Sequence, residues 1–269
     1  MRIIVLGVEG MLGNYVSKYL KFKKYDVIFG SREFFDAAKI NGPVLKGILS
    51  NPFFHQNDVV INCIGVINKR VESLGIRNTI QVNSVFPHLL NEACNHVGLR
   101  LIHITTDCVY SGKKGNYSEN DPHDATDIYG KTKSLGEPEL ATVIRTSIIG
   151  EEVKNARSLI EWIKSNKGGT IDGYFHHKWN GVTCLRLAQE IEYIINEGKY
   201  WLGVKHFYGN TVNKYELCSM VNEIYKLGIT INFKDTEIKN MKLTTVRSDV
   251  VLSKPNLYSD IELQKEFGL

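Results

Sequence analysis

Short apolar runs alternate with helical patterns along the first half of the chain. Five of these runs have the length and β-branched content of buried strands, near 2–6, 26–30, 58–62, 101–105 and 142–146. Three segments between or after them have helical patterns, near 11–21, 83–97 and 129–138. The alternation predicts an α/β fold, a doubly wound parallel sheet with helices on both faces.

The pattern becomes irregular beyond residue 148. Helices are predicted at Ser158 to Lys164, Cys184 to Asn196 and Tyr215 to Lys226. With 269 residues and 43 % apolar content, the chain can bury one large core and a smaller one. We therefore expect a nucleotide-binding domain over 1–148 and a smaller C-terminal α/β substrate-binding lobe over 149–269, some segments of which return to the first sheet.

Glycines follow the first predicted strand at regular intervals. Gly7, Gly10 and Gly13 are spaced three apart, and an amphipathic segment begins directly after them. Such a turn lets a dinucleotide pyrophosphate approach bare backbone and rest on a helix N-terminus. The turn, with Met11 and Leu12 inside it, is therefore a predicted cofactor site, although a purely structural turn has the same pattern.

Tyr129 and Lys133 lie four residues apart, which places both on one face of a helix. A lysine in that position is expected to lower the pKa of the phenol, from about 10 toward the range of a working proton donor. Thr105 and Thr106 end a predicted strand, at the sheet edge where ligands of parallel sheets bind. The same spacing also occurs by chance on solvated helices, so these features count only together.

Charge and composition exclude several functions. The net charge of +4 is dispersed and no basic run is interleaved with aromatics, which argues against a nucleic-acid partner. No apolar run approaches the roughly 20 residues that span a bilayer, and the N-terminus does not resemble a signal peptide. We expect a cytoplasmic protein without membrane attachment. The five cysteines show no metal-ligand spacing, so we expect reduced thiols and no metal.

Taken together, these motifs resemble the extended short-chain dehydrogenase/reductases, and most closely the dTDP-4-dehydrorhamnose reductase branch. The resemblance covers almost the whole chain. It rests on the glycine turn and on five further segments: Asp58 to Asn62 as the fourth strand, Val82 to Pro87, Thr105 to Gly112, Tyr129 to Glu137, and Arg145 to Ser147. It implies a Rossmann-type first domain.

The resemblance implies NADPH-dependent reduction of the C4 ketone of a nucleotide-linked 4-keto-6-deoxy sugar. The substrate would be a UDP- or dTDP-linked hexose or 2-acetamido-hexose, and the product an L-sugar such as rhamnose or its N-acetyl relative. Tyr129 would donate the proton, Thr106 would bond the ketone oxygen, and Lys133 would anchor the nicotinamide ribose. Further cofactor contacts are expected from Cys63, Ile64, Gly65 and Asn83, with a helix N-cap as the alternative for Asn83.

The end of the second strand bears on cofactor choice. An acidic residue there would favour NADH, but the chain has Ser31 and Arg32, which suit a 2′-phosphate. NADP(H) is therefore favoured, with NAD(H) as the alternative. Glu33 weakens the inference, and a solvated Arg32 would not discriminate between the two.

Cys108 departs from the rhamnose-type pattern, in which this position is usually aromatic. It resembles the GDP-fucose synthases and the bifunctional epimerase/reductases, whose cysteine helps to invert carbons beside the ketone. A thiolate of pKa about 8.5 could remove such a proton. His176 and Lys178 are candidate partners for C3 or C3/C5 epimerisation, although the same loop could instead bind sugar or lie on the surface, and Cys108 could simply be packed.

Substrate contacts are expected from five residues, Val109, Tyr110, His177, Trp179 and Arg247. Arg247 could meet the substrate diphosphate or lie in a surface loop, and Trp179 could stack on a sugar or pack in the lobe. Two alternatives remain for the function. One is a dehydratase or C4 epimerase, and the other is a non-catalytic NADP-binding subunit, as in the methionine adenosyltransferase beta subunit. A homodimer is the default assembly.

Overall fold

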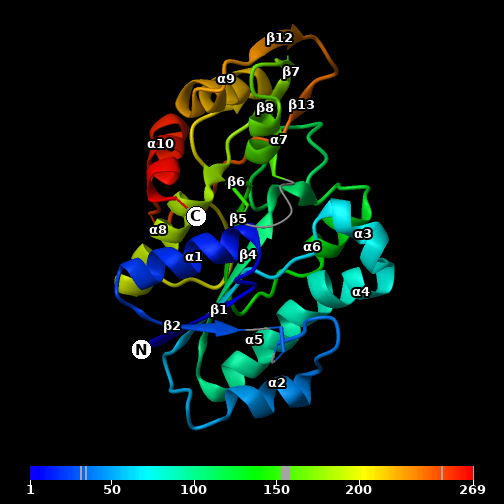
Figure 1. The fold of residues 1–269 in the computed structure, drawn as a ribbon. Coiled ribbons are helices and arrows are strands. Elements are labelled where there is room, and N and C mark those ends of the chain that lie inside the picture. The colour runs from blue at the N-terminus through cyan, green and yellow to red at the C-terminus, as the bar shows by residue number, and fades with distance from the viewer. Residues whose placement is uncertain (31, 34, 153–157, 250, 269) are drawn as a thin grey trace.

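A six-stranded parallel sheet forms the centre of the computed structural model, which describes residues 1–30, 32–33, 35–152, 158–249 and 251–268 (Figure 1). The strand order is β10-β5-β4-β3-β1-β2. The strands are β1 (Arg2–Leu6), β2 (Asp26–Gly30), β3 (Val59–Asn62), β4 (Arg100–Thr106), β5 (Thr142–Thr146) and β10 (Gly203–His206). Every residue of β3 and β5 is buried, as expected when helices cover both faces.

The sheet confirms the predicted fold class and the five predicted strands. The sixth strand, β10, was not predicted, and it pairs with β5 from far along the chain. The segment expected as a fourth strand is β3, the third in chain order.

Helices cover both faces of this sheet. On one face α1 (Met11–Phe22) packs with α8 (Cys184–Asn196) against the sheet core. The other face carries α2 (Gly42–Leu49) and α5 (Phe86–Val97). The remaining segments here are α3 (Asn68–Leu74), α4 (Ile76–Ile80), a π-helical turn (Gln81–Val85) and α6 (Ile128–Ser134). α6 lies beside the π-helical turn that leads into α5, where Ser84 donates to the Thr132 carbonyl at 2.7 Å.

A third apolar cluster forms the core of the smaller lobe. Its helices are α7 (Leu159–Ser165), α9 (Lys214–Tyr225) and α10 (Leu257–Phe267). Its strands form three small sheets: β11 (Val212–Asn213) with β8 (His177–Trp179) and β13 (Lys239–Asn240), β12 (Thr230–Lys234) with β7 (Thr170–Tyr174), and β6 (Ile148–Ile149) with β9 (Val182–Thr183). Because β10 and α8 pack on the main sheet, residues 149–269 contribute to both parts, and the division at residue 148 stays a prediction.

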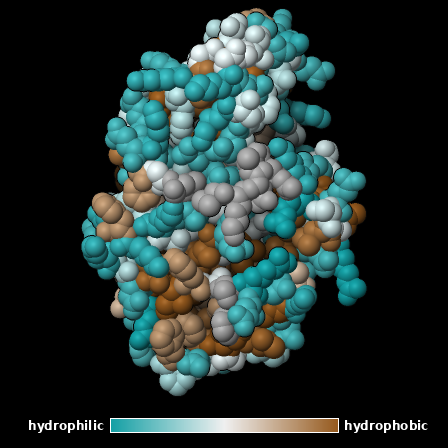
Figure 2. Space-filling view, viewed as in Figure 1, coloured by the Kyte–Doolittle hydropathy of each residue, from teal (hydrophilic) through white to brown (hydrophobic). Residues whose placement is uncertain are grey.

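The two parts differ in surface character. Figure 2 shows hydrophilic side chains over most of the smaller lobe, whereas apolar side chains gather lower on this face, over the main sheet and its helices. Phe29 of β2 is 47 % exposed. Among the described helices, none has the length and apolar content required to cross a membrane.

The glycine turn depends on one left-handed backbone conformation and one close approach of backbone to backbone. Gly7 has a φ of +80°, and a Cβ on Gly13 would lie 2.2 Å from the Gly7 carbonyl oxygen. A side chain at residue 13 would therefore force the strand and α1 apart, since the obstructing atom is backbone.

Gly13→Ala is expected to lower the free energy of unfolding by about 3 kcal/mol, because this overlap cannot be relieved by a rotamer change. Urea unfolding followed by circular dichroism measures the change. Gly47→Ala is the matched control, since Gly47 lies in α2 with open space around it and should gain up to about 1 kcal/mol. Equal midpoints for Gly13→Ala and the wild type would contradict this account of the turn.

Candidate active site

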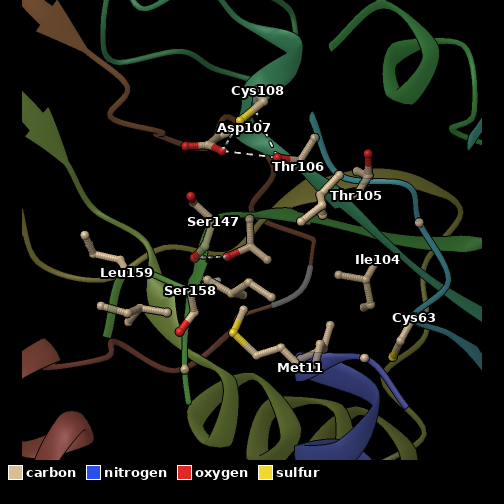
Figure 3. A pocket seen from close by; sticks show the side chains of 18 of the residues that line it. Met11, Cys63, Ile104, Thr105, Thr106, Asp107, Cys108, Ser147, Ser158 and Leu159 are labelled. Carbon is tan, nitrogen blue, oxygen red and sulfur yellow. Dashed lines mark hydrogen bonds between the residues drawn. The ribbon is translucent and has the colours of Figure 1, made fainter. Parts of the chain in front are cut away.

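A cavity of about 590 Å³ lies between the carboxyl edge of the main sheet and the smaller lobe. Figure 3 shows Thr106, Asp107 and Cys108 at one end, and Met11 and Cys63 at the other. Eleven of the predicted site residues line it: Gly10, Met11, Leu12, Cys63, Ile64, Gly65, Thr106, Cys108, Tyr129, Lys133 and Trp179. The fold therefore brings the glycine turn and the Tyr129 motif to one cavity.

Helix α6 places Tyr129 and Lys133 on its cavity-facing side. Asp127 caps the helix by accepting from the Gly130 backbone N–H at 2.9 Å. A Cβ on Gly130 would lie 2.4 Å from the Cys108 carbonyl oxygen, so only glycine lets α6 approach the end of β4 this closely. The motif therefore brings the phenol beside Thr106 and the ammonium beneath the sheet edge.

The protonation of this pair differs from the sequence-based expectation. Burial raises the pKa of Tyr129, with Cys108 adding to the rise and the Thr106 hydroxyl opposing it. The expected lowering by Lys133 is wrong in this structure, because the phenol is enclosed and the ammonium instead donates to the Ile104 carbonyl at 3.2 Å. Burial lowers the pKa of Lys133 to about 8. The site thus holds a neutral phenol next to a lysine whose charged form is destabilised by burial.

The end of β4 forms a small hydrogen-bonded group, which begins a 3₁₀ turn (Asp107–Val109). The Thr106 hydroxyl accepts from the Cys108 backbone N–H at 3.1 Å and donates to Asp107 Oδ1 at 3.3 Å. Cys108 Sγ also donates to that oxygen, at 3.5 Å. Burial raises the pKa of Asp107 to about 6, opposed by hydrogen bonds from Ser147, Cys108 and Thr106.

Cys108 is not the readily ionised thiol expected from the sequence. Burial and the neighbouring Asp107 raise its pKa to about 12. At neutral pH it is a hydrogen-bond donor to Asp107 rather than a base.

Asn83 lies outside the cavity and links two of the segments that line it by hydrogen bonds. Its amide accepts from the Val66 backbone N–H at 2.8 Å and donates to the Val66 carbonyl at 3.0 Å and the Thr132 hydroxyl at 3.1 Å. It lies within the π-helical turn, so the alternative of a helix N-cap is wrong. The bonds tie the segment after Gly65 to α6, and the cofactor contact predicted for Asn83 stays untested.

Val109 and Tyr110 point away from the cavity into a separate buried cluster. Tyr110 stacks on Tyr117 with ring centroids 4.2 Å apart, and its hydroxyl accepts from Arg145 at 2.6 Å. Arg145 is itself buried against Glu137 and His206. Val109 and Tyr110, which were predicted to contact substrate, therefore pack behind the cavity and do not line it.

The predicted loop after Tyr174 divides at strand β8. Trp179 lines the cavity, whereas His176, His177 and Lys178 do not. His176 pairs with Asp235 at 3.0 Å, the His177 ring lies 4.9 Å from that of Tyr174, and Lys178 is exposed. The expected juxtaposition of His176 and Lys178 with Cys108 is therefore wrong in this structure.

Neither predicted arginine lines the cavity. Arg247 donates to the carbonyls of Leu202 at 2.8 Å and Val204 at 3.2 Å, and pairs with Asp249. Arg32 is mostly exposed and lies 3.8 Å from an Asp36 oxygen. Ser31 lies outside the described residues.

The cavity also contains polar residues that were not predicted as site residues, among them Arg70, Asp107, Ser147, Glu152 and Lys214. Asp107 could have been found from its place beside Thr106. Lys214 had no such signal, because only the fold of the smaller lobe brings α9 to the end of β4. No group of three or more potential metal ligands occurs within the described residues.

Residues 1–192 match the family model described as the RmlD substrate binding domain. The chain belongs to this family. The match spans the whole of the glycine turn, the β4 edge and α6. It also ends before β10 and α9, so the family model does not reach Lys214.

Individual relatives are more distant. A Bacillus subtilis spore coat polysaccharide biosynthesis protein is 29 % identical over 154 residues, 54 % of this chain and 52 % of that protein. A dTDP-4-dehydrorhamnose reductase of Aggregatibacter actinomycetemcomitans is 27 % identical over 220 residues, 77 % of this chain and 73 % of that protein. The chain spans about half the length of the first curated relatives that it matches.

The fold agrees with solved structures over nearly its full length. A Bacillus anthracis dTDP-4-dehydrorhamnose reductase, solved in complex with NADP, superposes with a TM-score of 0.80 at 19 % identity, covering 98 % of each chain. At that identity the likeness shows the architecture.

Proposed function

We propose that the protein reduces the C4 ketone of a nucleotide-linked 4-keto-6-deoxy sugar with NADPH. One observation carries the proposal: the Tyr129 phenol, the Thr106 hydroxyl and the Lys133 ammonium line the same cavity as the glycine turn. A proton donor, a second hydrogen bond for a ketone oxygen and a cation stand beside a dinucleotide-type turn. Membership of the family and the relatives named as dTDP-4-dehydrorhamnose reductases support this substrate class.

The residues around the glycine turn fit a dinucleotide. Gly10 is the N-cap of the 12-residue helix α1 and caps it without a side-chain hydrogen bond, so backbone N–H groups are available for a pyrophosphate. Cys63, Ile64 and Gly65 line the cavity beside this turn, and Lys133 Nζ lies 3.9 Å from where a Cβ on Gly65 would be. We propose NADP(H) as the cofactor, with NAD(H) as the alternative. When bound, the cofactor would supply hydride.

The chain's own groups have separable tasks in this reaction. The Tyr129 phenol, kept neutral by burial, donates its proton to the ketone oxygen as negative charge develops there. The Thr106 hydroxyl orients that oxygen, and the Cys108 backbone N–H holds the hydroxyl in place. The Lys133 cation stabilises the phenolate that remains. Trp179 and the start of α9 enclose the sugar from the smaller lobe.

The decisive assay follows NADPH absorbance with dTDP- and UDP-linked 4-keto-6-deoxyglucose. We expect NADPH oxidation and conversion of the C4 ketone to a hydroxyl, seen by NMR as a new H4 signal of a 6-deoxyhexose. An NADPH complex that consumes no cofactor with either sugar would instead support the non-catalytic alternative.

A further inference from the structure

The cavity contains a basic side chain that the proposed reduction does not use. Lys214 is the first residue of α9 and lines the cavity next to Trp179 and Leu217. Its position is fixed by a capping box, in which Asn213 and Glu216 satisfy one another's backbone N–H groups at 2.8 Å. Within the described part of the chain, the Lys214 ammonium makes no hydrogen bond or ion pair. It is therefore available to a ligand.

Lys214 approaches the end of the cavity that carries Asp107 and Cys108. The charge of Asp107 favours the protonated form of Lys214, and the charge of Lys214 favours the ionised form of Asp107. The two groups come from different lobes, Asp107 from the end of β4 and Lys214 from α9. A sugar ring held at Tyr129 and Thr106 would thus have a carboxylate on the sheet side and an ammonium on the lobe side.

We propose that Asp107 and Lys214 are an acid–base pair that exchanges hydrogens on the carbons flanking the substrate ketone. The inference rests on the proposed function, because it needs a 4-keto sugar in the cavity. It assigns C3 or C5 epimerisation to residues other than the Cys108, His176 and Lys178 set expected from the sequence.

The proton balance of the step is complete within the site. The Asp107 carboxylate takes a hydrogen from C3 or C5 as a proton, and that bonding pair becomes the double bond to C4. The carbonyl electrons move to the oxygen, where Tyr129 and Thr106 hydrogen-bond the enolate. The Lys214 ammonium then donates a proton to the other face of the same carbon. Exchange with solvent restores both groups, and no oxidant or reductant is consumed.

The protonation states suit these roles. Burial raises the pKa of Asp107 to about 6, so the carboxylate is ionised at neutral pH but is a stronger base than an exposed aspartate. Burial lowers the pKa of Lys214, which makes the ammonium a readier donor. Cys108, held as a thiol, serves by bonding Asp107 Oδ1 at 3.5 Å.

The test is hydrogen exchange in deuterium oxide without reduced cofactor. The protein is incubated with dTDP- or UDP-linked 4-keto-6-deoxyglucose, and the H3 and H5 signals are followed by NMR. The wild type should wash deuterium into at least one position faster than the protein-free sample. Asp107→Asn and Lys214→Met should each slow this exchange at least about 100-fold. Circular dichroism verifies that both variants are folded.

Lys239→Met is the matched control. Lys239 is an exposed lysine of β13 whose charge also acts on Lys214, but it does not line the cavity. Its exchange rate should stay within about twofold of the wild type, because only a general charge effect is removed.

Each outcome separates the two proposals. NADPH oxidation without solvent deuterium at C3 or C5 would overturn the acid–base pair and leave the reductase intact. Exchange at C3 or C5 without NADPH oxidation would overturn the proposed reductase activity and leave the acid–base pair intact. Exchange that Lys214→Met leaves unchanged, with only the KM for reduction raised, would make Lys214 a binding cation and overturn its role as an acid.

Discussion

Tyr129→Phe is expected to lower kcat/KM for ketone reduction about 1,000-fold, because general acid catalysis by a positioned side chain contributes 10²- to 10⁴-fold. The phenol is the proton donor that burial keeps neutral, and phenylalanine keeps its ring but loses its hydroxyl. The assay is steady-state NADPH oxidation with the 4-keto sugar that the wild type accepts. The loss should fall mainly on kcat, since the removed hydrogen bond strengthens in the transition state.

Binding of NADPH, followed by its fluorescence, should be nearly unchanged in Tyr129→Phe. Tyr193→Phe provides the comparison, since Tyr193 lies on α8 away from the cavity. A variant that binds NADPH and reduces the sugar at near wild-type rate would remove Tyr129 from its proposed role.

Lys133→Met is expected to abolish reduction and, at the same time, stabilise the protein. Burial holds the pKa of Lys133 at about 8 against 10.5 for a free side chain, so the charged form is disfavoured by about 3 kcal/mol in the folded state. The lost bond to the Ile104 carbonyl offsets about 1 kcal/mol. At pH 7 we expect a net gain of about 2 kcal/mol in urea unfolding, with at least a 100-fold loss of activity.

The pH dependence of this stabilisation has a definite sign. Between pH 8 and 10.5 the unfolded wild type binds more protons than the folded protein, so wild-type stability rises with pH there. The advantage of Lys133→Met should therefore be full below pH 8 and shrink as the pH rises toward 10.5. Lys131→Met, on the exposed side of the same helix, should change stability by less than about 0.5 kcal/mol. A Lys133→Met protein that is less stable than the wild type at pH 7 would show that the buried ammonium is well compensated.

The sequence predicted those features that depend on local pattern. Strand β1, its glycine turn and α1 follow one another within a short stretch, and the Tyr129 to Lys133 spacing is set by helical geometry alone. Both could be identified before the fold was known. Helices α2, α3, α4 and α10 were missed, because they are short or weakly patterned and are stabilised by packing.

Features that depend on distant segments could not be predicted in the same way. The positions of His176 and Lys178 follow from the pairing of β8 with β11 and β13, and Lys214 enters the cavity only because α9 follows β11. The protonation states expected from the sequence were wrong for a related reason. A lysine four residues from a tyrosine says nothing of burial, and burial dominates the pKa values of Tyr129, Lys133 and Cys108.

Strand β10 is synthesised well after β5, the strand with which it pairs, and this order has a consequence for folding during translation. β5 is complete at Thr146, but its outer hydrogen-bonding edge pairs with residues 203–206. While the ribosome translates the intervening residues, the nascent chain therefore presents an open, apolar strand edge of the kind that recruits other chains. During that interval Arg145 also lacks its hydrogen-bond partner His206. Premature termination before residue 203 would leave a product prone to aggregation, even though it contained Tyr129, Lys133 and the glycine turn.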